Sequence, residues 1–149
     1  MRAVIQRVKE ATVSVDGIEL GSIDHGLLVY LGVSPTDTEA EVAWVTQKIA
    51  KLRIFNDEAG KMNKSVTDID GGVMIISQFT LYGDLRKGNR PSFNGAGDPA
   101  LAESLYEACI SEMKTLVPRV ASGSFGAYMQ VQYTNDGPVT LVLEYPEAE

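Results

Sequence analysis

The pattern of hydrophobic and polar positions in the first third of the chain predicts β-strands. Residues 3–8 (AVIQRV) and 11–15 (ATVSV) alternate apolar and polar side chains, as strands with one buried face do. The Asp16-Gly17 pair that follows predicts a two-residue hairpin. The apolar run at 26–33 (GLLVYLGV) is bounded by glycines and predicts a strand buried on both faces.

Two stretches with helical spacing lie between the predicted strands. Thr38 and Glu41 have the spacing of a capping box, so the first helix is predicted to begin near Thr38. Asp98 as N-cap and Pro99 in the first helical position predict the start of the second helix, which Pro118 ends. The expected inward-facing stripes are Val42, Val45, Ile49 and Leu52 in the first helix, and Leu101, Leu105, Cys109, Met113 and Leu116 in the second.

The remaining apolar runs predict strands at 72–83 (GVMIISQFTLYG), 128–134 (YMQVQYT) and 139–145 (VTLVLEY). The last two flank 135–140 (NDGPVT), which has the composition of a hairpin turn with Pro138 opening the next strand. This order of elements predicts an α/β fold of the α+β kind, in which a mainly antiparallel sheet or small barrel packs with two helices. The length of 149 residues suits a single domain.

Composition and charge narrow the classes of protein. Hydrophobic residues make up 44% of the chain and charged residues 22%, which is typical of a soluble globular protein. The first residues alternate in polarity and no later run would span a bilayer, so we expect no membrane association and a cytoplasmic location. The net charge of −7 argues against broad, nonspecific binding of nucleic acid.

Few residues offer ordinary catalytic chemistry. The single histidine, His25, is expected to be a solvated turn residue, and the single cysteine, Cys109, a buried structural one. No GxSxG, Walker or GxGxxG motif occurs, and the His, Cys and carboxylate residues are not spaced as metal ligands. We therefore expect neither a metal nor a cofactor.

The segment from Ser77 to Asp84 (SQFTLYGD) turns polar directly after an apolar strand. If the strand stays extended, Gln78 and Thr80 share one face, and Ser77 and Phe79 the other. A strand that simply emerges into solvent has the same composition. Because a hydroxyl without a base is a poor nucleophile, any catalysis here would rest on positioning and on backbone N–H groups that stabilise an oxyanion.

A set of motifs extends over nearly the whole chain. In order they are MRAVIQRV, GLLVYLGV, KLRIF, SQFTLY, GNRPSF, SGSFGAYMQV and NDGPVT. In these motifs and their order the sequence resembles the D-aminoacyl-tRNA deacylase family. Tyr128 departs from the pattern, because an acidic residue is expected there in this family.

The resemblance implies a homodimer that hydrolyses the ester between a D-amino acid and the 3′-terminal adenosine of tRNA. It implies glycyl-tRNA, including glycine mischarged on the tRNA for alanine, as a second substrate. It also implies that Gly137-Pro138 is cis and enters the active site of the other subunit, although X–Pro bonds in general are cis in only about 5–6% of cases. Residues 77–80 would line that site, and Arg7 would fix the Gly-Pro loop, where a solvated strand arginine is the plain alternative.

A rigid backbone wall suits selection by chirality. Carbonyl groups held by a proline ring do not yield to an L side chain, and glycine allows close approach. The vicinal 2′-hydroxyl of the substrate is the expected source of chemical assistance. Backbone amides near Phe79 and Thr80 would polarise the ester carbonyl, and Thr80 would position the substrate.

Two further contacts with tRNA are expected. Phe125 would stack on the terminal adenine, although a core phenylalanine explains the residue equally well. Arg86, Lys87 and Arg90 would meet phosphates of the acceptor stem, although a basic loop is usually just solvated.

Two other functions stay open at this stage. A dimeric module that binds an RNA 3′ end or a nucleotide without cleaving it fits the lack of a histidine network. A general esterase for small D-acyl compounds is the second. Release of D-amino acid from tRNA distinguishes the deacylase from both.

Overall fold

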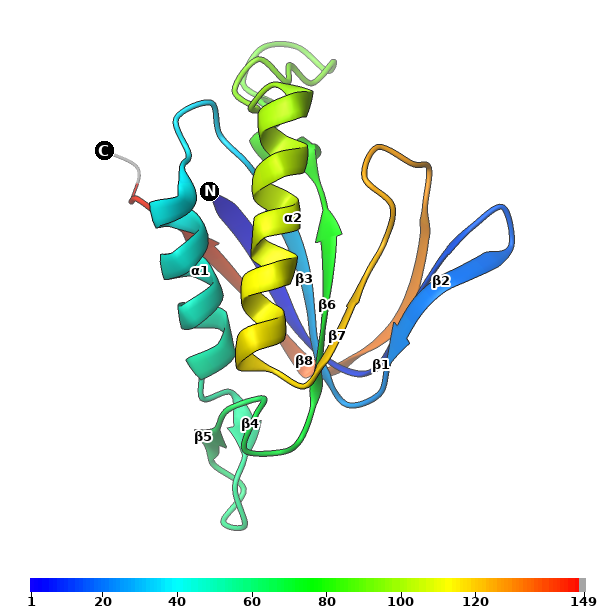
Figure 1. Cartoon of the computed structure of the whole chain (residues 1–149), viewed down its shortest axis with the longest axis vertical. Helices are drawn as coiled ribbons and strands as arrows, with labels where there is room; N and C mark the ends of the chain where they lie inside the picture. The colour runs from blue at the N-terminus through cyan, green and yellow to red at the C-terminus, as the bar shows by residue number, and fades with distance from the viewer. Residues whose placement is uncertain (148–149) are drawn as a thin grey trace.

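The computed structural model describes residues 1–147, which form a six-stranded sheet, a two-stranded sheet and two α-helices (Figure 1). The first half of the chain contains β1 (Arg2–Val15), β2 (Ile18–Ile23), β3 (Gly26–Gly32), α1 (Glu39–Lys51), β4 (Phe55–Asn56) and β5 (Met62–Lys64). The second half contains β6 (Gly72–Ser77), the 3₁₀ helix η1 (Phe79–Tyr82), α2 (Pro99–Leu116), β7 (Arg119–Ser122) and β8 (Gln130–Glu144). Neither helix is apolar enough along a sufficient length to cross a membrane.

The large sheet has the strand order β2-β1-β3-β6-β7, and β8 pairs with β1 as well. The pairs of β1 with β2, β3 and β8 are antiparallel, whereas β3–β6 and β6–β7 are parallel. The sheet curls until β2 contacts β7, and α1 and α2 lie side by side over one face (Figure 1). The predicted α/β fold, with two helices and a mainly antiparallel, barrel-like sheet, is therefore confirmed.

Two hydrophobic clusters explain why β3 is almost entirely apolar. Leu27 and Val29 belong to the core between the sheet and the helices, whereas Leu28 points into a second core with Val13 and Met74 inside the curled sheet. The strand is thus buried on both faces, as its sequence predicted.

The predicted helix starts are confirmed by their caps. The Glu41 carboxylate accepts a hydrogen bond from the Thr38 N–H at 2.7 Å, as a capping box requires. The Asp98 carboxylate accepts from Ala100 N–H at 3.0 Å and Leu101 N–H at 3.2 Å, and Pro99 needs no such partner. Asp98 thereby fixes the start of α2 beside the end of β6.

The structure corrects two of the strand predictions. Residues 3–8 and 11–15 lie in one continuous strand, β1, and residues 128–134 and 139–145 do not form two strands joined by a hairpin. Residues 130–134 and 139–144 of these stretches belong to β8, which pairs with β1 on both sides of NDGPVT. β1 is long enough to pair with the residues on both sides of NDGPVT.

NDGPVT is therefore a bulge in β8. Gln6 pairs with Thr140 and Val8 with Asn135, so a two-residue step along β1 faces a five-residue step along β8. Gly137 has φ +124°, a conformation that L side chains rarely adopt. The Gly137-Pro138 bond is cis, as the resemblance implied and against the general preference for trans.

Candidate active site

A cleft of about 710 Å³ opens where β6 ends, between η1, the start of α2 and the loop that connects β7 to β8. Ser77, Gln78, Phe79 and Phe125 are among the residues that line it. These four predicted site residues are thus brought together from two segments far apart in the sequence. Thr80 is exposed next to them, and its hydroxyl accepts a hydrogen bond from the Gln78 side-chain amide.

The backbone of SQFT leaves the sheet instead of continuing as an extended strand, so the prediction of a strand through residue 83 is wrong. Ser77 pairs with Leu31, and the Gln78 N–H donates to the Leu31 carbonyl at 2.8 Å. The chain then turns into η1, where the first repeating bond runs from Leu81 N–H to the Gln78 carbonyl. Gln78 and Thr80 lie side by side through this turn rather than through strand alternation.

Two backbone amides at the start of η1 are free to bind a ligand. Among residues 1–147, neither the Phe79 N–H nor the Thr80 N–H donates a hydrogen bond to the protein. This is the normal consequence of a helix start, because its first donors have no acceptor within the helix. The pair lies beside the cleft and can stabilise negative charge on an oxygen atom.

Phe125 lines the cleft from the loop between β7 and β8, and it is half-buried and contacts the core. Its ring lies 6.1 Å from that of Tyr106, whose hydroxyl donates to the Ile75 carbonyl at 2.9 Å. Phe125 therefore packs against the core and also lines the cleft. Its position is compatible both with a core phenylalanine and with stacking on the terminal adenine. Sequence reasoning assigned no site role to Phe93 or Asp98, which also line the cleft; their only signals were the GNRPSF motif and the N-cap pattern.

Arg7 holds the backbone directly before the Gly-Pro pair. Its side chain is buried, and its Nη1 donates to the Ile54 carbonyl at 2.7 Å. Its Nε donates to the Asp136 carbonyl at 3.2 Å and lies 3.4 Å from the Asp136 carboxylate. A Cβ on Gly137 would lie 3.0 Å from the guanidinium, which leaves little space for any other residue there. The alternative of a solvated strand arginine is wrong.

Gly137 and Pro138 do not reach the cleft of their own chain. Arg7 pairs with Leu27 at the start of β3, whereas Ser77 pairs with Leu31 near its end. Four residues of strand separate these positions by roughly 13 Å. Figure 1 shows the same arrangement, with the end of β6 in the upper half of the view and the middle of β8 in the lower half. The two motifs thus lie at opposite ends of the sheet.

His25 lies near the Gly-Pro bulge and not in the cleft. Its Nε2 is 3.8 Å from the Asp136 carboxylate, and its ring meets Phe55 edge-on at 5.2 Å. The side chain is about half exposed, which agrees with the predicted turn position. It has an acidic neighbour that the sequence did not reveal. No three His, Cys, Asp or Glu side chains within residues 1–147 are grouped to hold a metal ion.

The predicted basic residues Arg86, Lys87 and Arg90 are all exposed in the loop after η1. The Arg86 guanidinium binds both oxygens of the Asp84 carboxylate, at 2.9 and 2.7 Å. These hydrogen bonds lower the pKa of Asp84 to about 2, so the pair stays ionised at neutral pH. Part of the positive charge of this loop is thus compensated within the loop itself.

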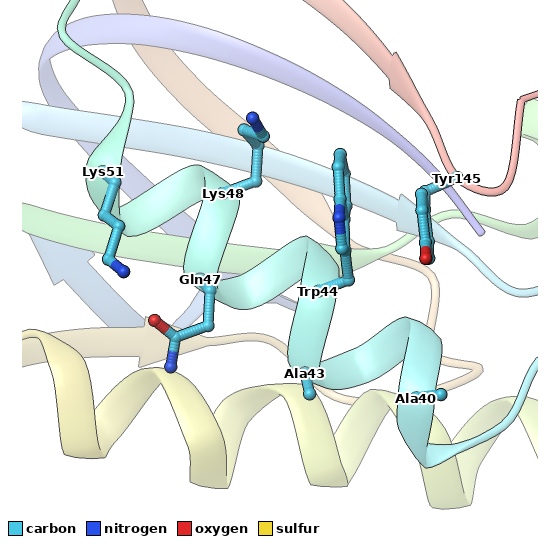
Figure 2. A pocket seen from close by; sticks show the side chains of 7 residues that line it. All are labelled: Ala40, Ala43, Trp44, Gln47, Lys48, Lys51 and Tyr145. Carbon is cyan, nitrogen blue, oxygen red and sulfur yellow. The ribbon is translucent and has the colours of Figure 1, made fainter.

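A separate hollow of about 520 Å³ lies over α1, away from the SQFT segment (Figure 2). The Trp44 and Tyr145 rings stack there with centroids 4.0 Å apart, and the Lys48 ammonium lies 5.1 Å from the centre of the indole. Figure 2 shows the Lys48, Trp44 and Tyr145 side chains next to one another along this face. Among residues 1–147, no histidine, cysteine, serine, threonine or carboxylate lines this hollow, and its Lys48 ammonium lies over the Trp44 indole.

Cys109 is expected to be inert towards thiol reagents in the native protein. Burial raises the pKa of its thiol to about 12, so only about one thiol in 10⁴ is ionised at pH 8. Labelling with iodoacetamide at pH 8 should be at least about 100-fold slower in the native protein than in 8 M urea, since only unfolding exposes the sulfur. Equal labelling rates would contradict the buried position of this side chain.

Comparison with known proteins decides the family. The model of the family described as D-Tyr-tRNA(Tyr) deacylase matches residues 4–144. The chain belongs to this family. A D-aminoacyl-tRNA deacylase of Lacticaseibacillus casei (strain BL23) is 56% identical over 144 residues, covering 97% of each chain. A second, of Deinococcus deserti, is 55% identical over 146 residues, covering 98% of this chain and all of the other.

Two solved structures agree with the family assignment. The c-Myc DNA unwinding element binding protein superimposes with a TM-score of 0.93 at 44% identity, over 99% of this chain and 100% of that one. A probable eukaryotic D-amino acid tRNA deacylase superimposes with a TM-score of 0.81 at 17% identity, over 95% and 97% of the two chains. At that identity the second likeness concerns the fold alone. The resemblance read from the motifs is thus confirmed at the level of the family.

Proposed function

We propose that the protein hydrolyses the ester bond of D-aminoacyl-tRNA and releases the free D-amino acid and tRNA. The observation that carries the proposal is the cleft that Ser77, Gln78, Phe79 and Phe125 line together, in a chain of the deacylase family. The names of the relatives, which are more than 50% identical to this chain, support the same activity. Glycyl-tRNA, including the tRNA for alanine mischarged with glycine, is the proposed second substrate. The proposed location is the cytoplasm.

The site is proposed to be completed by a second copy of the chain. Within one chain the Gly-Pro bulge and the cleft lie at opposite ends of β3. A homodimer with two-fold symmetry can place the bulge of each subunit at the cleft of the other. In this arrangement Arg7 acts on the partner's site through the loop that it holds.

Selection against L-amino acids is proposed to be steric. The proline ring fixes its own φ, and Arg7 binds the carbonyl of Asp136 immediately before Gly137. A backbone wall held from both sides leaves room for hydrogen at the α-carbon but none for an L side chain. The D side chain would point away from this wall, so D-residues of many sizes, and glycine, fit the same site.

A hydroxyl group of the substrate is proposed to assist the reaction in place of a catalytic base of the protein. The free N–H groups of Phe79 and Thr80 would bind the ester carbonyl oxygen as it becomes negatively charged. The 2′-hydroxyl of the terminal ribose lies next to the ester and would assist the attack of water. Phe125 would stack on the terminal adenine, and Arg86, Lys87 and Arg90 would approach the acceptor-stem phosphates.

One assay tests the proposal against its alternatives. Purified protein is incubated with D-tyrosyl-tRNA, L-tyrosyl-tRNA and N-acetyl-D-tyrosine ethyl ester, and the released products are measured. We expect release from the D-aminoacyl-tRNA alone. Binding of tRNA without release would indicate an RNA-binding module, and cleavage of the small ester would indicate a general esterase.

The name of the 44% identical structure states DNA binding for that protein. The assay above tests whether this chain acts on charged tRNA. The net charge of −7 gives this chain little capacity to neutralise phosphates along a duplex. A duplex DNA oligonucleotide should therefore bind much more weakly than charged tRNA at 150 mM salt.

Thr80→Ala is expected to retain measurable deacylation. If the hydroxyl only positions the substrate, kcat should fall by about 10- to 100-fold, the effect of losing one hydrogen bond of about 1.5–3 kcal/mol. Thr80→Ser, which keeps the hydroxyl, should stay close to wild type. Single-turnover rates on D-tyrosyl-tRNA measure both variants, and an acyl-Thr80 adduct detected by mass spectrometry would show that the hydroxyl attacks instead.

A further inference from the structure

Tyr128 is a large aromatic side chain that its own chain leaves almost uncovered. It lies in the loop between β7 and β8, lines the rim of the cleft and is 88% exposed. Phe125 lies three positions earlier in the same loop and is half-buried in the cleft wall. The loop therefore presents one ring inside the cleft and a second ring at its mouth.

Two further aromatic side chains line the cleft. Phe79 and Phe93 both line it, with ring centroids 5.1 Å apart in an edge-to-face contact, and they are 55% and 38% exposed. Among residues 1–147, Asp98 is the one charged residue that lines the cleft, and its carboxylate already accepts two N–H groups of α2. Recognition at the mouth thus depends on aromatic surface rather than on ion pairs.

We infer that Tyr128 stacks on the base of the nucleotide that precedes the terminal adenosine. This inference rests on the proposed function, which places the ester at Phe79 and Thr80 and the adenine against Phe125. The RNA chain must then leave over the rim that Tyr128 forms. The 3′ end of tRNA is unpaired there, and an unstacked base gains from contact with an aromatic face whatever its sequence. The phenol is also uncharged and does not repel the adjoining phosphate.

A pair of substrates separates this contact from the rest of the site. D-tyrosyl-tRNA contains the preceding nucleotide, whereas 3′-O-D-tyrosyl-adenosine carries the same ester and adenosine without it. Tyr128→Ala is expected to raise KM for D-tyrosyl-tRNA by about 5- to 150-fold, the range of one lost base–aromatic stack, with kcat little changed. Tyr128→Phe retains the ring and should behave as wild type. On the adenosine substrate the wild type and both variants should have the same kinetics.

Other results would overturn the inference. Unchanged KM for D-tyrosyl-tRNA in Tyr128→Ala would show that the ring binds no base. Equal losses on both substrates would place the ring on the adenosine or on the cleft itself. Loss of dimer in sedimentation equilibrium would show that a second copy of the chain covers Tyr128. If the wild type cleaves neither substrate, the proposed function fails, and that outcome is distinct from all of these.

Discussion

D-tyrosyl-tRNA that ends in 2′-deoxyadenosine is expected to be cleaved about 10²- to 10⁴-fold more slowly than the normal substrate, the range of a lost acid–base group. The reason is the absence of a protein base among the described residues of the cleft. Within one chain His25 lies at the other end of β3, the carboxylate of Asp98 caps α2, and the thiol of Cys109 is buried with its pKa raised to about 12. The proposed dimer would bring His25 nearer to the other subunit's cleft, together with the bulge beside it, so the deoxy substrate decides between this imidazole and the substrate's own hydroxyl, which we expect to assist.

The measurement is the single-turnover rate with saturating enzyme, so that a change in binding does not enter. The deoxy substrate should bind as the normal one does, and its competition against normal D-tyrosyl-tRNA provides that control. The loss of rate should exceed that caused by Thr80→Ala. The Thr80 hydroxyl only positions the substrate, whereas the 2′-hydroxyl assists the attack of water. Equal rates on the two substrates would show that a group of the protein, and not the 2′-hydroxyl, assists the reaction.

Local signals in the sequence were sufficient for the elements that depend on neighbouring residues. The Thr38–Glu41 capping box, the Asp98-Pro99 start and the Asp16-Gly17 hairpin all specify structure within a few residues, and all were predicted correctly. The same kind of signal failed in NDGPVT. Asn-Asp-Gly suits a turn and a bulge alike, and only the pairing of both flanks with β1 decides between them.

The site was predictable in part for the same reason. The polar residues after an apolar strand marked Ser77–Thr80, and the motifs marked Phe125, but the alternation of β1 could not show that Arg7 is buried. Its burial depends on the Ile54 carbonyl and on the bulge at Asp136, which come from 47 and 129 residues further along the chain. Likewise, the sequence could not show that Tyr128 lines the same cleft as η1 and Phe93.

Arg7→Ala is expected to lower kcat/KM on D-tyrosyl-tRNA by about 100-fold or more, the cost of misplacing a group at the reacting centre by about 1 Å. The variant loses the bonds to the carbonyls of Ile54 and Asp136, so the Gly-Pro bulge is no longer held on one side. The Ile54 carbonyl is left without its donor, which should lower the free energy of unfolding by about 1–3 kcal/mol. Arg7→Lys should recover little activity, because one ammonium does not span both acceptors.

Arg119→Ala is the matched control. Arg119 also binds one backbone carbonyl and one carboxylate, both of Asp70, at 2.9 and 2.8 Å, but at the surface and on β7, three strands along the sheet from β1. It should keep full activity, and urea unfolding curves of both variants separate a loss of stability from a loss of function. An Arg7→Ala protein that folds, dimerises and deacylates as wild type would exclude the proposed role of this side chain.

Mixing two defective variants tests whether Arg7 serves the other subunit. A heterodimer of Arg7→Ala with Thr80→Ala contains one site that combines an intact Thr80 with a bulge held by an intact Arg7, if each bulge enters the partner's cleft. Subunit exchange should then raise activity well above that of either variant alone. If each site instead used its own bulge, every site in the mixture would carry a defect and activity would stay at the mean of the two variants. Recovery is the expected result, because within one chain the bulge and the cleft are separated by the length of β3.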